Sequence, residues 1–211
     1  MTSAHPSRKA ISVHAALLAE LTLEEKASLC LGSDLWHTAP IPRLGIPALR
    51  LSDGPHGLRL PPGGGEAIAG GRPATCFPTA SALGSSWDAE LVRRIGAAIG
   101  AEARAHDVSV VLGPGINIKR SPLCGRNFEY FSEDPHVAGV LGAALIQGLQ
   151  SRGVGACVKH FAANNQENRP QRLGPNPATP VRGIATLGAR RDTTRVVGAA
   201  VRPTPYWSAR V

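Results

Sequence analysis

The chain has 211 residues and a formal net charge of +8, enough for one domain with its own core. Residues 169–211 contain eight Arg and a single acidic residue, whereas residues 1–168 have a net charge of only +1. A nucleic-acid-binding face requires basic residues patterned on a folded surface, so this distribution argues against a nucleic-acid partner. Neither a membrane-spanning run nor an apolar signal segment is present, so we expect a cytoplasmic protein without a membrane partner.

The first 60 residues predict a helical arm, a short helix and a strand. Residues 1–20 are expected to form the arm. Thr22 and Glu25 form a capping box that opens a short helix, which we expect Gly32 to stop. Residues 48–51 then predict a strand that leads into Ser52-Asp53-Gly54-Pro55-His56-Gly57.

Two further strands alternate with two helices in the following hundred residues. Asp88 predicts the N-cap of a helix with an apolar face at Leu91, Val92, Ile95 and Ile99. Residues 108–112 predict a strand. Asp134 and Pro135 then predict a helix start, with a face at Val140, Leu141, Ala144, Leu145 and Leu149. Residues 154–158 predict the third strand.

This β-α-β-α-β order indicates a parallel sheet with crossover helices. Polar, Gly and Pro residues collect after each strand, which is typical of a (β/α)8 TIM-type barrel with its active site at the strand ends. Roughly 150 residues supply three or four strands, so we expect an incomplete barrel. A doubly wound sheet is the alternative, although no G-x-G-x-x-G follows the first strand.

Residues 169–211 break this pattern with six prolines and eight arginines. They predict a disordered basic tail, or the product of a reading frame lost near Arg169. The four cysteines are scattered without a C-x-x-C pair, which indicates free thiols. No His/Cys cluster has metal-ligand spacing, so we expect no metal and no other cofactor.

The three predicted strand ends supply groups that suit a ligand rich in hydroxyls. The first supplies Asp53 and Arg59, the loop after the second supplies Arg126, and the third supplies Lys159 and His160. Carboxylates accept from hydroxyls, and Arg and Lys donate to them. Structural roles remain open for each: a turn cap for Asp53, a polar strand end for Lys159 and His160, and an ion pair with Glu129 or Glu133 for Arg126.

Four motifs occur in order in this sequence. They are Ser52-Asp53-Gly54-Pro55-His56-Gly57-Leu58-Arg59, Phe77-Pro78-Thr79, Gly125-Arg126-Asn127-Phe128-Glu129-Tyr130-Phe131-Ser132-Glu133-Asp134-Pro135 and Lys159-His160-Phe161. Together they resemble the N-terminal barrel domain of the glycoside hydrolase family 3 β-glucosidases. The resemblance covers about residues 20–168, so we divide the chain into an arm (1–20), a barrel part (21–168) and a tail (169–211).

The resemblance implies retaining hydrolysis of terminal β-D-glucosyl residues, with a β-glucoside or a related oligosaccharide as substrate. By position, Asp53 would accept from the distal hydroxyls of the sugar, and Arg59, Arg126, Lys159 and His160 would donate to its hydroxyls. The following Ala162-Ala163-Asn164-Asn165 looks like the glucosidase branch of the family rather than the N-acetylhexosaminidase branch. Glu129 is interpreted as the partner of an Arg rather than as the acid/base.

The resemblance also implies that the catalytic carboxylates lie elsewhere. The family nucleophile is an Asp in a Ser-Asp-Trp-like context on a later strand, and the acid/base follows later still. Ser33-Asp34-Leu35-Trp36 mimics that context but precedes the first strand, so we interpret it as a coincidence. We therefore expect this polypeptide to be inactive by itself. The alternative is a non-catalytic, sugar-binding remnant.

Overall fold

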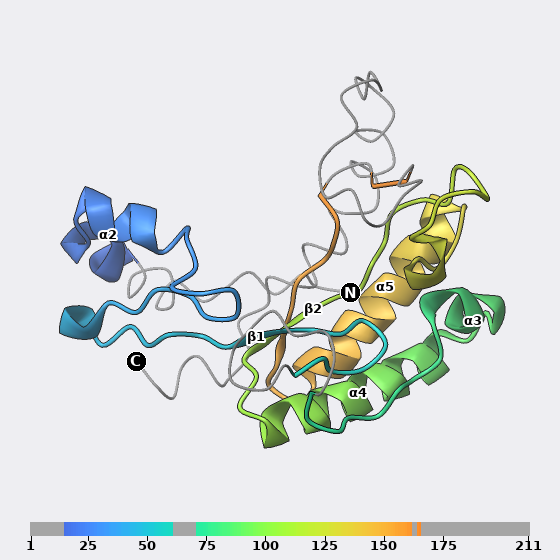
Figure 1. The fold of residues 1–211 in the computed structure, drawn as a ribbon, viewed down its shortest axis with the longest axis horizontal. Helices are drawn as coiled ribbons and strands as arrows, with labels where there is room; N and C mark the ends of the chain where they lie inside the picture. Colours follow the sequence, from blue (N-terminus) through green and yellow to red (C-terminus); the bar gives the residue numbers. More distant parts are fainter. Residues whose placement is uncertain (1–14, 61–70, 162–163, 166–211) are drawn as a thin grey trace, which may run out of the picture.

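A three-stranded parallel sheet and two long helices organise the computed structural model, which describes residues 15–60, 71–161 and 164–165 (Figure 1). The strands are β1 (Leu51–Asp53), β2 (Val110–Leu112) and β3 (Gly155–Ala156), in the order β1-β2-β3. Both strand pairs are parallel, with Leu51 opposite Val110 and Val110 opposite Gly155. The predicted β-α-β-α-β order is confirmed.

The two long helices begin at the predicted caps. Helix α4 (Ala89–Ala105) starts after Asp88, whose carboxylate accepts from the Leu91 amide at 2.9 Å. Helix α5 (Pro135–Gln150) starts after Asp134, whose carboxylate accepts from the His136 amide at 2.7 Å. Each cap satisfies a backbone donor that has no partner within the helix, which explains why Asp stands at both starts.

Helices α4 and α5 lie side by side against the sheet (Figure 1). Glycines bring the two backbones together: a Cβ atom at Gly96 would collide with the Leu145 carbonyl, and one at Gly148 with the Arg93 carbonyl. The core beneath the sheet contains the buried side chains of Ile99, Val111 and Leu149. Close helix contact and apolar packing therefore fix the sheet from one side.

Shorter elements connect this core. Residues 15–20 are helical, and α2 (Leu23–Ser28) carries the predicted capping box. It ends at its C-cap Leu29, before the predicted stop at Gly32. The other elements are η1 (Pro42–Leu44), α3 (Ala80–Ser85) and η3 (Asn127–Glu129), none of which the sequence predicted. The Gly-rich residues 61–70 and the predicted disordered tail, 169–211, lie outside the described residues.

The sequence predictions were wrong about the bounds of the three strands and about one residue on the buried face of α5. The first strand begins at Leu51 rather than at residue 48, and it includes Asp53. The other two strands are shorter than predicted, at residues 110–112 and 155–156. Val140 is 45% exposed rather than part of the core face of α5. That helix instead buries a broad surface, because its small residues let neighbouring segments approach it closely.

The described residues thus show part of an α/β fold with a small parallel sheet. None of their helices is long and apolar enough to cross a membrane.

Candidate functional site

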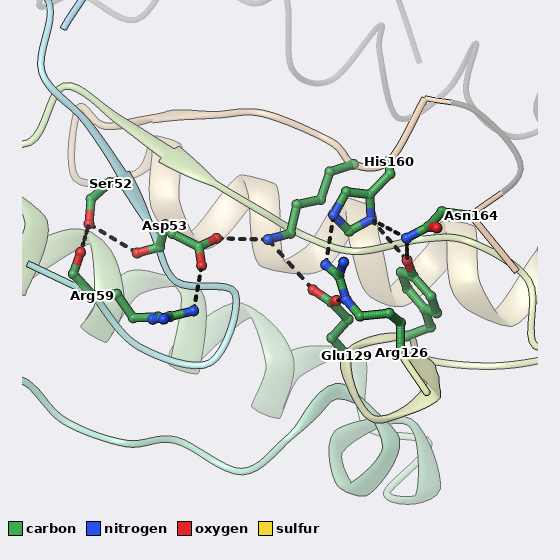
Figure 2. A network of polar contacts seen from close by, with 9 residues as sticks. Ser52, Asp53, Arg59, Arg126, Glu129, His160 and Asn164 are labelled. Carbon is green, nitrogen blue, oxygen red and sulfur yellow. Dashed lines mark hydrogen bonds and ion pairs between the residues drawn. The ribbon is translucent and has the colours of Figure 1, made fainter. Parts of the chain in front are cut away.

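The five predicted site residues come together at the carboxyl end of the sheet (Figure 2). Asp53 is the last residue of β1, and Lys159 and His160 follow β3. Arg126 immediately precedes η3. The carboxyl ends of parallel strands meet at one edge, so residues 106 positions apart in sequence, Asp53 and Lys159, become neighbours.

Asp53 binds two cations at once. Lys159 Nζ donates to Oδ1 at 2.8 Å, and Arg59 Nη1 donates to Oδ2 at 3.1 Å. Burial favours the neutral acid, but the hydrogen bond and charge of Lys159, aided by the charge of Arg59, outweigh it and hold the pKa of Asp53 below its ordinary value. The carboxylate is therefore ionised at neutral pH. Its ion pairs with Lys159 and Arg59 give it a role beyond capping a turn.

Glu129 links the two halves of the network. Its residue is only 3% exposed, its Oε1 accepts from Arg126 Nε, and its Oε2 lies 3.5 Å from Lys159 Nζ. This confirms the interpretation of Glu129 as the partner of an Arg, and Arg126 thus pairs with one of its two predicted partners. The additional contact with Lys159 was not predicted, because it depends on how the fold brings η3 close to the segment that follows β3.

The ring of His160 is held from both sides. Arg126 Nη2 lies 2.9 Å from Nε2, and the Tyr130 hydroxyl lies 2.9 Å from Nδ1. An arginine can only donate, so Nε2 accepts and the proton of the neutral ring stands on Nδ1. The Tyr130 hydroxyl then accepts from His160, and also from Asn164 Nδ2 at 2.9 Å. Tyr130 is buried, and this burial raises the pKa of its hydroxyl far above the ordinary value.

The backbone of His160 is fixed as firmly as its ring. Asn117 Oδ1 accepts from the His160 amide at 2.7 Å, and Asn117 Nδ2 donates to the His160 carbonyl at 3.1 Å. No sequence signal marked Asn117, Tyr130 or Asn164 as site residues. Tyr130 and Asn164 stand within the quoted motifs, but only the fold shows that they share one histidine.

His56 lies beside this network with a different character. Both of its ring nitrogens are buried and have no hydrogen-bond partner among the described residues, and its ring contacts that of Phe128 at a centroid distance of 6.0 Å. Burial lowers the pKa of His56 below its ordinary value, although the nearby carboxylates of Glu129 and Asp53 oppose this effect. His56 is therefore neutral at pH 7.

Asp34 lies outside the network. It precedes β1 and binds its own loop, accepting from the Trp36 amide at 2.6 Å and contacting His37 Nδ1 at 2.9 Å. These contacts account for the Ser33-Asp34-Leu35-Trp36 segment structurally. Within the described part of the chain, no group of three His, Cys, Asp or Glu residues could hold a metal ion.

The arrangement alternates acceptors and donors along one line: Arg59, Asp53, Lys159, Glu129, Arg126 and His160 (Figure 2). Such a line can exchange hydrogen bonds with several adjacent hydroxyls of one ligand, because each hydroxyl both donates and accepts.

Comparisons with known proteins agree with this chemistry. The family model for the glycosyl hydrolase family 3 N-terminal domain matches residues 42–174. Thermostable beta-glucosidase B of Acetivibrio thermocellus is 61% identical over 155 residues, which are 72% of this chain and 20% of that protein. An exo-alpha-(1->6)-L-arabinopyranosidase of Bifidobacterium longum is 53% identical over 151 residues, or 70% of this chain and 20% of that protein.

Solved structures show the same likeness. Beta-glucosidase 3B from Thermotoga neapolitana, in complex with alpha-D-glucose, superposes with a TM-score of 0.65 at 45% identity, over 72% of this chain and 23% of that one. Beta-glucosidase from Kluyveromyces marxianus, in complex with glucose, gives a TM-score of 0.66 at 44% identity, over 72% and 18%. The chain spans about a fifth of the length of the curated relatives it matches.

Proposed function

Because this chain belongs to glycosyl hydrolase family 3, we propose that the network at the end of the sheet holds the terminal sugar of a β-glucoside. The reaction served by this site is retaining hydrolysis of a terminal β-D-glucosyl residue. The observation that carries the proposal is the double engagement of Asp53 by Lys159 and Arg59. It places an ionised acceptor between two donors, at the strand ends where barrel enzymes bind their substrates.

Each residue has a proposed part in holding the sugar. Asp53 accepts from the distal hydroxyls, and Lys159 and Arg59 donate to neighbouring ones. Arg126 and His160 donate to the remaining hydroxyls. Since both ring nitrogens of His160 already contact protein groups, its contact with a sugar exchanges one of these partners.

We further propose that the 211-residue polypeptide does not hydrolyse glycosides by itself. A retaining mechanism requires a carboxylate nucleophile and an acid/base about 5–5.5 Å apart. The carboxylates at the described site, Asp53 and Glu129, are each bound to two cations and so serve to position them. The sheet would belong to a closed (β/α)8 barrel in the complete enzyme.

The identity of the sugar has a second candidate. The relatives named above include an arabinopyranosidase besides the beta-glucosidase. Binding of an aryl β-D-glucoside and of an aryl α-L-arabinopyranoside to the chain should therefore be compared side by side.

The test is a glucose titration of the 211-residue chain, followed by NMR or calorimetry. We expect weak, saturable binding that Asp53→Asn abolishes, because the amide cannot hold Lys159 and Arg59 as the carboxylate does. Asp34→Asn is the matched control, since Asp34 lies outside the network. Equal binding by both variants would contradict the site. Turnover of an aryl glycoside by the wild-type chain, absent from Asp53→Asn, would contradict the proposed inactivity. Binding without turnover also fits a non-catalytic sugar-binding remnant.

A further inference from the structure

Lys119 is a half-buried cation in the segment that follows β2, and its side chain donates to a serine rather than to a carboxylate. Its Nζ lies 2.8 Å from Ser81 Oγ. Burial lowers the pKa of Lys119 below its ordinary value, and no carboxylate among the described residues opposes that effect. Withdrawing an ammonium from water without an ion pair offsets what its hydrogen bond contributes to stability. Stability alone therefore gives little reason for a lysine at this position.

Ser81 passes the contact of Lys119 on to η3. A lysine can only donate, so the Ser81 hydroxyl accepts from Lys119 and donates its own proton elsewhere. That proton goes to the carbonyl of Asn127, whose oxygen lies 2.9 Å from Ser81 Oγ. The same carbonyl accepts from the Tyr130 amide at 3.2 Å, which closes the turn of η3. Because hydrogen bonds in a chain polarise one another, the cation strengthens the bond by which Ser81 anchors this turn.

The segment that carries Lys119 contacts the site at two other points. The Lys119 amide donates to the Ser132 carbonyl at 3.3 Å, just beyond η3. Two residues before Lys119, the side chain of Asn117 binds the amide and the carbonyl of His160, at 2.7 and 3.1 Å. This short segment therefore fixes the backbone of His160 at one end and the surroundings of η3 at the other.

We propose that Lys119 is a positioning residue of the sugar site: acting through Ser81, it fixes η3 so that Arg126 meets His160. The inference rests on the proposed function, in which Arg126 and His160 donate to sugar hydroxyls. Arg126 is the N-cap of η3 and Glu129 is its last residue, so a shift of this turn moves a guanidinium and a carboxylate of the network together. Hydrogen bonds weaken steeply with angle and distance, so a small shift weakens the contact with His160 Nε2.

Nitrogen NMR of the His160 ring in the 211-residue chain tests this role, because Nε2 reports the contact with Arg126. We expect Lys119→Met and Ser81→Ala each to move the Nε2 signal toward its position in Arg126→Met. Lys119→Arg keeps a charged donor and should restore the wild-type signal. The double variant should move the signal no further than either single change, since both act on one chain of hydrogen bonds. Lys26→Met, on the exposed surface of α2, is the matched control and should leave the signal in place.

An unmoved Nε2 signal in Lys119→Met would overturn the proposal, because a lysine with a merely structural role acts on the urea midpoint alone. Additive shifts in the double variant, or a full shift in Lys119→Arg, would overturn it as well. A glucose titration of the same variants separates this inference from the proposed function. We expect Lys119→Met to weaken binding by about three- to tenfold, as for the loss of one hydrogen bond.

The two readouts together distinguish the possible failures. If the Nε2 signal moves but glucose does not bind the wild-type chain, the proposed function fails and the hold of Lys119 on η3 stands. If glucose binds the wild-type chain and Lys119→Met equally well, the proposed function stands and Lys119 has no positioning role in the sugar site.

Discussion

Replacing Glu129 by Gln tests whether the site is held together by its buried carboxylate. The side chain of Glu129 is 4% exposed, and its two cationic partners, Arg126 and Lys159, are 26% and 16% exposed. Breaking a fully buried ion pair costs about 3–5 kcal/mol. Here each cation keeps another partner, Asp53 for Lys159 and His160 for Arg126, and both reach solvent. We therefore expect a loss of about 2 kcal/mol, in the range of charged hydrogen bonds.

The assay is urea unfolding followed by circular dichroism of α4 and α5, with an osmolyte present throughout to strengthen burial. With a slope of roughly 1–3 kcal/mol per molar urea, the expected loss lowers the midpoint by about 1 M. Glu90→Gln is the control, because Glu90 forms the same kind of i,i+3 pair with Arg93 on an exposed surface. It should leave the midpoint nearly unchanged. Equal midpoints for the two variants would refute the reasoning.

Three further changes probe the packing and the histidines. Gly148→Ala should lower the unfolding free energy by about 1–3 kcal/mol, because its Cβ meets the Arg93 carbonyl; an unchanged midpoint would contradict the close helix contact. The folded chain keeps His56 neutral with a lowered pKa, so stability should fall as the pH drops below about 6.5. His56→Gln should flatten that dependence, and an identical pH profile would count against it. Arg126→Met should shift the nitrogen NMR signals of His160 away from a ring protonated on Nδ1, because the arginine donates to Nε2; unaltered signals would show that this contact does not fix the tautomer.

The parts of the fold that were predictable depend on local chemistry. Asp88 and Asp134 cap helices by bonding amides two or three residues away, so sequence alone located both starts. Strand limits depend on partners far along the chain. The ladder begins at Leu51 because Val110 stands opposite it, a pairing that residues 48–51 do not encode locally. Helix α3 was missed because Ala80–Ser85 contains no amphipathic period.

The site shows the same division. Convergence of Asp53, Lys159 and Arg126 was predictable, because parallel strands deliver their ends to one edge. The bonding partners were not predictable. Glu129 lies near Lys159 because of the turn at η3. Asn117 accepts from the His160 amide although the two residues are 43 positions apart in the sequence. His56, whose ring nitrogens have no partner in the described part of the chain, had no sequence signal either, since burial of a histidine depends on what packs over it.

The charges at the described site bear on the mechanism. Its ion pairs join three cations, Arg59, Arg126 and Lys159, to the two carboxylates of Asp53 and Glu129. His160, with its proton on Nδ1, adds no charge, so the network has an excess of one positive charge. An acidic group brought to this edge by another segment would be attracted and kept ionised, because nearby cations favour the charged form of a carboxylate. A carboxylate nucleophile must be ionised to attack. Under the proposed function, a carboxylate nucleophile brought to this edge would therefore stay ionised beside the sugar that we propose the network holds.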